Sequence, residues 1–305
     1  MSAFRQEGGA PSAENTLTVS VIIPHLDDLD NLDRCLTLLG QQTFRSFEII
    51  VVDNGSRAGI DAVRAVAGTR ARVVQAIHKG AGPARNAGVE SSRGTTLAFI
   101  DSDCRPVPEW IAEGVVSLAS HDVVGGSVRV DVDDRGNMSP TEAFEVVFAF
   151  RNDMYIRRKG FTVTASMFVR RDVFDTVGPF RAGVSEDMDW CHRARRLGYR
   201  LSYAPNSVVW HPARRTWAEL RRKSDRLTSE AFELYREMPF GRLRWLGRTW
   251  LIPASLVPHL VHVMTTAKLS APGDRLKAAQ VLIRIRLARF VEANRLALRR
   301  PPQKA

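Results

Sequence analysis

The stretch LAFIDSDC, Leu97 to Cys104, places Asp101 and Asp103 directly after an apolar run. A short apolar run ended by polar residues is typical of a buried strand. Open α/β sheets bind ligands beyond the carboxyl ends of their strands, so both aspartates are predicted to face a pocket. Two carboxylates this close repel each other unless a cation, ribose hydroxyls or solvent relieves the charge. A divalent metal that carries a diphosphate is the simplest relief, because Mg²⁺ is held by one or two carboxylates together with substrate phosphates.

The residues around this stretch predict strands that alternate with helices. A Val/Ile-rich segment, residues 18–24, is expected to be a strand that Pro24 stops. FEIIVVD, residues 47–53, is expected to be a second buried strand, and a third is expected near residues 73–77. Between the first two, Leu32, Leu36 and Leu39 are spaced as on one face of an amphipathic helix. This alternation indicates a mainly parallel sheet covered by helices on both faces.

The composition indicates one large domain and leaves room for a smaller module. The chain has 305 residues and is 44% hydrophobic, which is enough to bury a substantial core. Cys35, Cys104 and Cys191 are an odd set without metal-like spacing, so we expect a reducing compartment and no disulfide framework. Residues 1–16 lack the apolar centre of a signal peptide and are expected to form a disordered leader.

The excess of positive over negative charge lies entirely in the last third of the chain. The net charge is +11 overall, but residues 1–211 carry 24 basic against 26 acidic side chains, whereas residues 212–305 carry 20 against 7. Both ends of this last region resemble helices in which basic and apolar residues interleave. No nucleic-acid recognition motif accompanies the charge, so a nucleic-acid partner is not expected.

Within the basic region, Thr249 to Ala267 contains no Lys, Arg, Asp or Glu. The segment approaches the length of a membrane span, but Pro253 and Pro258 argue against a regular transmembrane helix. Two interpretations stay open. One is a basic amphipathic surface that attaches to an anionic leaflet. The other is a helical cap that packs on the catalytic domain, because helical periodicity does not distinguish a membrane face from a core face.

The motifs occur in an order that resembles glycosyltransferase family two. They are Pro24 after the first strand, DNGS (residues 53–56), ARNAG (84–88), FIDSD (99–103) and SEDMDW (185–190). The ordered combination is more specific than any single motif.

The resemblance covers roughly residues 17–215 and implies a GT-A fold, an α/β architecture with a mainly parallel sheet flanked by helices. Residues 17–211 would form the catalytic domain, with a nucleotide-sugar half at 17–103 and an acceptor half at 104–211. Residues 212–305 would form the basic helical extension.

The resemblance also implies an activity and a setting. The activity is inverting, metal-dependent transfer of a sugar from a nucleotide-diphosphate donor, with a UDP-sugar favoured, to a hydroxyl of a glycan or lipid-linked acceptor. The setting would be synthesis of a bacterial exopolysaccharide or other cell-envelope glycan. The protein would then be peripheral at the cytoplasmic face of the inner membrane.

For the donor side, the resemblance assigns Asp103 as the leading ligand of Mg²⁺ or Mn²⁺. Asp101 resembles the position that contacts ribose or assists the metal, with Ser102 beside it in the nucleotide-sugar site. Asp53 resembles the residue near the nucleobase and ribose, although an Asx-turn is an equally ordinary role for it. Pro24 is expected to shape the nucleotide loop, and His25 is a weaker candidate in the same loop.

Arg85 and Asn86 are expected to open a helix behind Gly80 and Gly82. Small residues allow close backbone approach, and a helix N-terminus favours anions. Arg85 could therefore contact phosphate or brace a carboxylate.

For the acceptor side, SEDMDW supplies carboxylates at an expected helix start, where Ser185 is a plausible N-cap. By resemblance, Asp187 is the general base that removes the acceptor hydroxyl proton, and Glu186 orients it or binds sugar hydroxyls. Asp189 is expected to serve structure or the acceptor. Trp190 could form a sugar platform, although an aromatic residue on a helix is more often core.

His211 follows a short strand, and by resemblance it completes the metal or diphosphate site; a structural histidine is the alternative. Arg214 and Arg215 follow at once and could clamp the donor diphosphate or a lipid phosphate. TASMFVRR, residues 164–171, resembles the strand that borders the acceptor cleft.

Two other functions stay open. A sugar-phosphate nucleotidyltransferase also combines an α/β sheet with metal-binding aspartates, but a Gly-rich basic loop would be expected where this chain has PHLDDLDN, residues 24–31. The second is a catalytically silent sugar-nucleotide-binding or scaffold subunit, against which the retained carboxylates argue.

Overall fold

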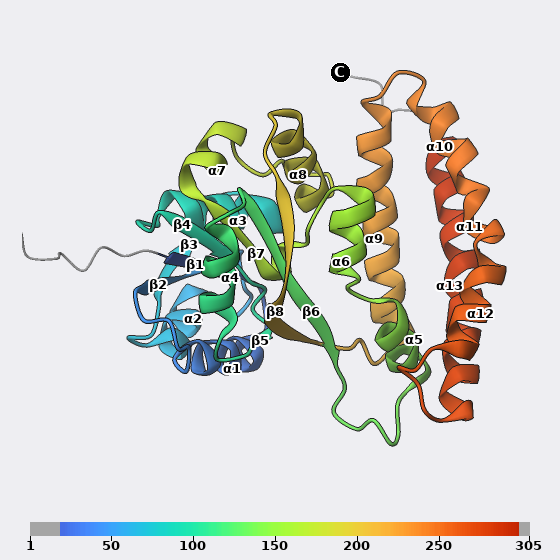
Figure 1. Ribbon diagram of the computed structural model, residues 1–305, viewed down its shortest axis with the longest axis horizontal. Helices are drawn as coiled ribbons and strands as arrows, with labels where there is room; N and C mark the ends of the chain where they lie inside the picture. Colours follow the sequence, from blue (N-terminus) through green and yellow to red (C-terminus); the bar gives the residue numbers. More distant parts are fainter. Residues whose placement is uncertain (1–18, 299–305) are drawn as a thin grey trace, which may run out of the picture.

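The computed structural model describes residues 19–298, so the leader expected at residues 1–16 lies outside the described part. A central sheet organises the catalytic half (Figure 1). In chain order its strands are β1 (Val19–His25), β2 (Phe47–Asp53), β3 (Arg72–Gln75), β4 (Thr96–Phe99), β5 (Arg105–Pro106), β6 (Val123–Asp131), β7 (Met167–Arg170) and β8 (Leu201–Pro212).

Helices connect these strands and then follow them. In chain order they are α1 (Leu29–Leu39), α2 (Ile60–Ala67), α3 (Ala81–Glu90), α4 (Trp110–Leu118), α5 (Pro140–Phe148), α6 (Asn152–Met154), α7 (Arg171–Val177), α8 (Glu186–Arg196), α9 (Trp217–Arg236), α10 (Gly241–Thr249), α11 (Leu251–Ala254), α12 (Leu256–Thr265) and α13 (Pro272–Leu298). A π-helical turn, Tyr155–Lys159, follows α6, and a 3₁₀ turn, Thr164–Ser166, precedes β7.

The sheet has the strand order β3-β2-β1-β4-β7-β6-β8-β5. Strands β1 to β4 pair in parallel, as do β6 and β8. β7 runs antiparallel to both β4 and β6, and β5 runs antiparallel to β8. The predicted mainly parallel sheet is therefore confirmed, and β7 is the strand expected within residues 164–171.

Helices cover both faces of the sheet because successive strand residues point to opposite sides. Val21 and Ile23 pack with α1, α2 and α4 on one face. Ile22 packs with α3, α7 and α8 on the other. The three cysteines are buried and free, and Cys104 packs in the first of these clusters as expected.

The first strand does not stop at Pro24, because β1 continues to His25. Pairing with β4 runs only from Val19 to Ile22, whereas pairing with β2 continues to the end of β1. Proline lacks a backbone N–H and is tolerated where a strand loses a neighbour. Pro24 thus lies where β1 emerges beyond β4.

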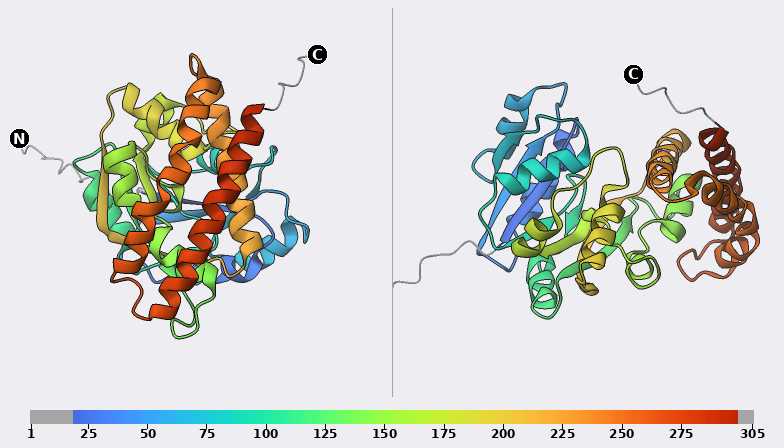
Figure 2. Two further views of the ribbon diagram at one scale, coloured as in Figure 1. Left: turned by 90° about the vertical axis from the view of Figure 1, so that its right-hand side faces the viewer. Right: turned by 90° about the horizontal axis from the view of Figure 1, so that it is seen from above.

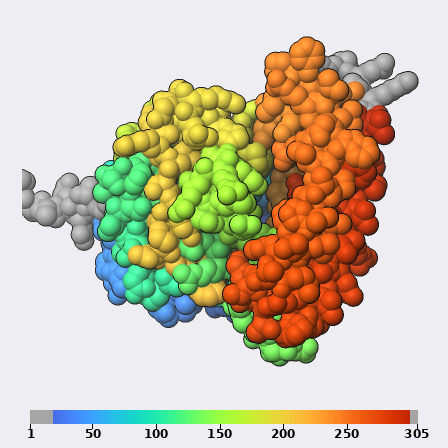
Figure 3. Space-filling view, turned by 45° about the vertical axis from the view of Figure 1, so that its right-hand side comes forward, coloured from blue at the N-terminus to red at the C-terminus, as the bar shows by residue number. Residues whose placement is uncertain are grey.

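The C-terminal helices stand beside the sheet domain (Figures 1 and 2). They join the domain through an apolar cluster in which Ala143 and Val147 of α5 meet Val263 of α12 and Leu282 of α13. Figure 3 shows the hollow between these helices and the sheet domain. The helices thus pack on the catalytic half as a cap.

The uncharged segment Thr249 to Ala267 is divided between the end of α10, the short α11 and α12. Within the described residues, no helix combines the length and apolarity needed to cross a bilayer. The two prolines lie in α11 and α12, each within the first turns of a short helix, where a missing N–H costs little.

The outer side of the C-terminal helices carries apolar stripes. On α13, Leu276, Leu287 and Val291 are all more than half exposed, and on α12 Val257 and Val261 are also more than half exposed. Spacings of four and of eleven residues correspond to whole turns of an α-helix, so each set lies on one face of its helix. These faces are exposed.

The packing of α13 on α5 predicts a difference between two leucines of one helix. Leu282→Ala should lower the free energy of unfolding by about 2–5 kcal/mol, because the side chain is fully buried among α5 and α12. Leu287→Ala, at a site that is 57% exposed, should change it by less than about 0.5 kcal/mol. Urea unfolding of both variants measures this, and equal losses would contradict the packing.

Candidate active site

A cavity of about 1200 Å³ lies between the carboxyl ends of β1, β2 and β4 and the C-terminal helices. Its walls include most of the residues predicted from the motifs. They are Pro24, His25, Arg85, Asp101, Ser102, Asp103, Glu186, Asp187, His211 and Arg214. Three predicted residues do not line it: Asp53, Trp190 and Arg215. The cavity is thus formed where an open α/β sheet binds ligands.

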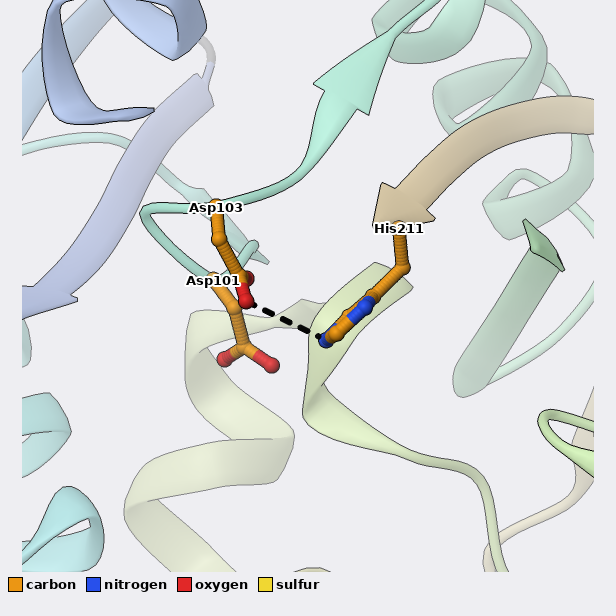
Figure 4. A group of neighbouring side chains, drawn as sticks. All are labelled: Asp101, Asp103 and His211. Atoms are coloured by element: carbon orange, nitrogen blue, oxygen red, sulfur yellow. Dashed lines mark ion pairs between the residues drawn. The ribbon is translucent and has the colours of Figure 1, made fainter. Parts of the chain in front are cut away.

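Asp101, Asp103 and His211 converge at one end of this cavity (Figure 4). The aspartates come from the loop after β4, and the histidine comes from the end of β8. One ligand atom from each residue lies within 4.8 Å of the other two, and His211 Nε2 is 3.4 Å from Asp103 Oδ2. β8 therefore brings His211 close to Asp101 and Asp103, although the residues are far apart in the sequence.

The imidazole of His211 is held in one orientation by its neighbours. Its Nδ1 lies 2.9 Å from the carbonyl oxygen of Pro212, to which it donates, so Nε2 points at Asp103. The ring of Phe150 packs on it with a centroid distance of 4.5 Å. Phe150 has φ +51°, a strained conformation for a residue with a side chain, and Lys223 Nζ lies 4.7 Å from the centroid of its ring.

These three side chains fit a hard divalent cation. Carboxylate oxygens and imidazole nitrogen suit Mg²⁺ and Mn²⁺. Burial raises the pKa of Asp103, His211 opposes this rise, and Asp101 adds to it. The Asp103 carboxylate is thus destabilised as an anion, and a bound cation would remove that cost.

Arg85 was predicted to lie at a helix start. It lies instead in the second turn of α3, which begins at Ala81. Its side chain is 4% exposed and forms two ion pairs, with Asp101 at 2.7 Å and with Glu186 at 2.8 Å. Of the two roles predicted for Arg85, bracing a carboxylate is therefore the one seen. The same side chain links the loop after β4 to the start of α8.

Two further contacts hold α8 against α3. The Asn86 side chain donates to the Phe180 carbonyl oxygen and accepts from its N–H, both at 2.9 Å. A Cβ on Gly82 would lie only 3.4 Å from Cβ of Glu186. Because Gly82 has no side chain, the start of α8 can approach α3 closely at this point.

Asp187 faces the cavity from the first turn of α8. Its Oδ1 accepts hydrogen bonds from the Ser185 hydroxyl at 3.0 Å and the Met188 N–H at 2.7 Å. Burial, and then the charge of Glu186, raise the pKa of Asp187 to about 6. Ser185 occupies the N-cap position as predicted, but its hydroxyl donates to Asp187 and makes no capping bond.

At the nucleotide end, His25 is 1% exposed, and neither ring nitrogen has a hydrogen-bond partner among residues 19–298. Burial lowers its pKa, so the ring is neutral. Because buried polar groups are normally satisfied, His25 is a candidate to hydrogen-bond a ligand in the cavity that it lines. It is a stronger candidate than the sequence indicated.

Asp53 forms the Asx-turn that was its alternative role. Its Oδ1 accepts from the Ser56 hydroxyl at 2.6 Å and the Ser56 N–H at 3.1 Å, and the residue is 1% exposed. The next residue, Asn54, lines the cavity, and its Oδ1 accepts from the Gly80 N–H at 3.0 Å. Asp53 therefore shapes the loop that presents Asn54.

Trp190 is not a sugar platform, because it is fully buried between Phe174 and Phe180 and donates its indole N–H to the Gly178 carbonyl oxygen. Asp189 is structural, since it pairs with Arg181 and Arg193.

Arg214 and Arg215, the two arginines predicted to clamp a phosphate, lie in different environments. Arg214 pairs with Glu145 at 3.0 Å in the cavity wall. Arg215 is 70% exposed and lies near Asp133 and Glu142, outside the cavity. Its expected role as a clamp is therefore not supported.

Several cavity residues were missed because no motif marks them. Glu145 of α5 pairs with both Arg214 and Lys223. Burial lowers the pKa of Lys223 to about 8. Glu230 of α9 lies near Asp187, and burial raises its pKa to about 7. The sequence shows only that α5 and α9 are amphipathic, and their inward residues could not be assigned to this cavity.

The sequence profile of glycosyl transferase family 2 matches residues 20–178, more than half of the chain. Among curated proteins, glycosyltransferase AglE of Haloferax volcanii is 33% identical over 219 residues, which cover 68% of this chain and 71% of that protein. The amylovoran biosynthesis glycosyltransferase AmsE of Erwinia amylovora is 26% identical over 68% of this chain and 79% of its own length. The chain spans less than half of some other relatives.

Among solved structures, the mannosyltransferase PcManGT of Pyrobaculum calidifontis, in complex with GDP-Man and Mn²⁺, superposes with a TM-score of 0.60. It is 17% identical, and the match covers 93% of this chain and 88% of that one. Identity this low shows a shared fold, which includes the C-terminal helices. Together with the family match and the AglE alignment, it shows that this chain belongs to glycosyl transferase family 2 and is a glycosyltransferase with the GT-A fold.

Proposed function

We propose that the protein transfers a sugar, with inversion, from a nucleotide-diphosphate sugar to a hydroxyl of its acceptor. The observation that carries the proposal is that Asp187 and the cluster of Asp101, Asp103 and His211 line one cavity. The structure of PcManGT with GDP-Man and Mn²⁺ supports a nucleotide sugar and a metal in this fold. A catalytically silent subunit would not need a base with a raised pKa beside such a cluster.

For the donor, Asp101, Asp103 and His211 would hold Mg²⁺ or Mn²⁺. When bound, the metal neutralises charge that develops on the leaving diphosphate. Arg85 orients Asp101 through its ion pair, and Phe150 and Pro212 orient His211. Pro24, Ser102 and the unpartnered nitrogens of His25 would contact the nucleotide, for which UDP is our first choice.

For the acceptor, Asp187 accepts the hydroxyl proton while the acceptor oxygen bonds to the anomeric carbon. The bond from that carbon to the diphosphate breaks, and its electron pair leaves with the diphosphate. Asp187 is better suited than Glu186, because Arg85 occupies a Glu186 oxygen at 2.8 Å. A pKa near 6 leaves the Asp187 carboxylate ionised at neutral pH yet more basic than an ordinary aspartate.

The setting that we propose is exopolysaccharide or cell-envelope glycan synthesis at the cytoplasmic face of a membrane. AmsE is named for amylovoran biosynthesis. The last 94 residues carry 20 basic and 7 acidic side chains, and the exposed apolar stripes of α12 and α13 lie in the same region. Basic charge beside exposed apolar side chains complements an anionic lipid surface.

The metal assignment predicts the effect of Asp103→Asn. Loss of one anionic ligand should abolish metal-dependent UDP binding and lower transfer by about 100-fold or more, since it removes charge stabilisation of the leaving group. Calorimetric titration of Mn²⁺ in the presence of UDP measures the binding. Asp133→Asn, at a side chain that is 68% exposed, is the matched control. Unchanged metal dependence in a folded Asp103→Asn protein would contradict the assignment.

The base assignment predicts that kcat/KM, measured at saturating Mn²⁺, rises with pH to a plateau with a midpoint near pH 6. Asp187→Asn should keep UDP binding, lower turnover by about 10²–10⁴-fold and remove this pH dependence. Glu186→Gln should have the smaller effect on turnover. The reverse order of the two defects would exchange their roles.

The same pKa predicts the stability of Asp187→Asn. The folded pKa, about 6, lies above the ordinary value of 3.8, so the stabilising contribution of the protonated carboxyl is complete below pH 3.8 and is lost as pH rises through 6. Relative to the native protein, the variant should gain up to about 3 kcal/mol at pH 8 and little at pH 4. Thermal unfolding across this range provides the comparison.

The membrane proposal predicts co-sedimentation with vesicles that contain phosphatidylglycerol, and release as salt rises, because exposed charges are screened over about 8 Å at physiological ionic strength. Replacing Leu287 and Val291 by Glu should abolish this binding. Leu197→Glu, at an equally exposed leucine that follows α8 outside the C-terminal region, should not. Failure of the intact protein to bind at low salt would refute docking.

A further inference from the structure

Five basic side chains line one wall of the cavity. Arg151 precedes α6, Lys159 ends the π-helical turn, Arg248 lies on α10, and Arg286 and Arg289 lie on α13. They come from segments that are up to 138 residues apart in the chain and meet only in the folded protein. The cavity therefore has a basic wall in addition to its acidic end.

These five cations have no carboxylate partner within residues 19–298, since none of them takes part in an ion pair there. Arg286 lies 3.3 Å from His259 Nδ1, and Arg248 donates to the Tyr235 hydroxyl at 2.8 Å. Elsewhere in the cavity the cations form ion pairs with carboxylates, as Arg214 and Lys223 both do with Glu145. The basic wall is the exception.

The arrangement is electrostatically unfavourable when the cavity holds no anion. Burial, followed by the charges of Arg286 and Arg248, lowers the pKa of Arg289 to about 10. Burial and the neighbouring arginines also lower the pKa of Lys159. Like charges drawn together in a partly enclosed space favour the binding of an anion.

The basic wall and the base share one cavity, and Tyr155 lines it with them. Lys159 Nζ lies 4.8 Å from the centroid of the Tyr155 ring. Burial raises the pKa of Tyr155, the charge of Asp187 adds to this rise, and the charges of Arg151 and Arg289 oppose it. Tyr155 is therefore close to both Asp187 and the basic wall. The groups that influence Asp103 are instead His211, Asp101 and Arg214, so the donor end has its own set of charges.

Apolar side chains continue the wall toward the outside. Leu227, Trp245 and Ile252 line the cavity near Arg248, and Leu251 lines it while being 66% exposed. A ligand with a charged head and an apolar chain could thus place its head at the arginines and its chain along α10 and α11.

We propose that this basic wall binds a phosphate group of the acceptor, so that the acceptor hydroxyl is presented to Asp187. The acceptor is then a phosphate ester, either of an isoprenoid-type lipid or of a soluble molecule. This inference rests on the proposed function, because it assigns the second substrate of the same site. Guanidinium groups suit it, since they donate paired hydrogen bonds to phosphate oxygens.

The test measures ligand binding to the full-length protein by calorimetry. The probes are farnesyl phosphate below its micelle concentration, glycerol 3-phosphate, and farnesol, which lacks the charge. We expect the double variant R286Q/R289Q to weaken binding of farnesyl phosphate at least tenfold. Arg284→Gln is the matched control on α13, because Arg284 lies over the Trp217 ring at 4.0 Å, and it should change binding less than twofold.

The outcomes separate the two sources of phosphate. Glycerol 3-phosphate bound as tightly as farnesyl phosphate indicates a soluble ester, and much weaker binding indicates a lipid; both support a phosphate site. Farnesol bound as tightly as farnesyl phosphate would overturn it. So would unchanged binding in a folded R286Q/R289Q protein, or an equal loss in Arg284→Gln.

Binding of UDP with Mn²⁺ to the same proteins keeps this inference distinct from the proposed function. R286Q/R289Q should bind UDP and Mn²⁺ normally, and a loss there would assign the arginines to the donor and overturn the proposal. If no protein binds UDP while farnesyl phosphate binding still depends on Arg286 and Arg289, the proposed function fails and the phosphate site stands.

Discussion

Four carboxylates share one wall of the cavity, and the way in which the fold neutralises them determines the character of the site. Two follow β4, whereas Glu186 and Asp187 begin α8. Two unit charges 4 Å apart repel by about 4 kcal/mol at an effective dielectric constant of 20. Arg85 pairs with one carboxylate of each group, and His211 faces a third. Asp187 has no ion pair of its own within the described residues, and burial together with the charge of Glu186 raises its pKa to about 6, against the opposing effect of its two hydrogen bonds.

The two ion pairs of Arg85 also hold the loop after β4 and the start of α8 together. Arg85 is buried and pairs with two carboxylates, so its removal would leave both without their cation, a change that costs about 3–5 kcal/mol in buried pairs. Asn86 adds two hydrogen bonds to Phe180 in the loop that leads to α8. The donor end and the acceptor end are thus positioned by adjacent residues of one helix. A contact that stabilises the fold also decides which carboxylate is free to act as a base.

Residues at strand ends could be predicted from sequence, because an apolar run fixes where a strand stops and which edge of the sheet follows. Asp101 and Asp103 lie at that edge as predicted. Trp190 could not be assigned by spacing, since a helix start offers both an inward and an outward position, and Phe174 and Phe180 bury it. Arg85 was misplaced because the small residues before it already belong to α3. The position of the C-terminal helices beside the sheet depends on contacts between residues far apart in the sequence, so no local sequence pattern predicts it.

The arrangement of side chains around helix α13 explains why its charge pattern could not distinguish a membrane face from a core face. An α-helix turns about 100° per residue, so Arg286 and Arg289 lie within about 40° of Leu282, on the inward side, whereas Leu287 and Val291 lie about 140–180° away. The inward side is apolar where it meets α5 and becomes basic where it borders the cavity. The outward side is exposed and carries Leu287 and Val291 together with Arg284. This differs from a helix that only covers a core, in which arginines face solvent and leucines face inward. Such a helix is favourable when an anion occupies the cavity and an apolar surface covers the outside, and these are the two conditions that the proposed phosphate site and the proposed membrane docking would supply.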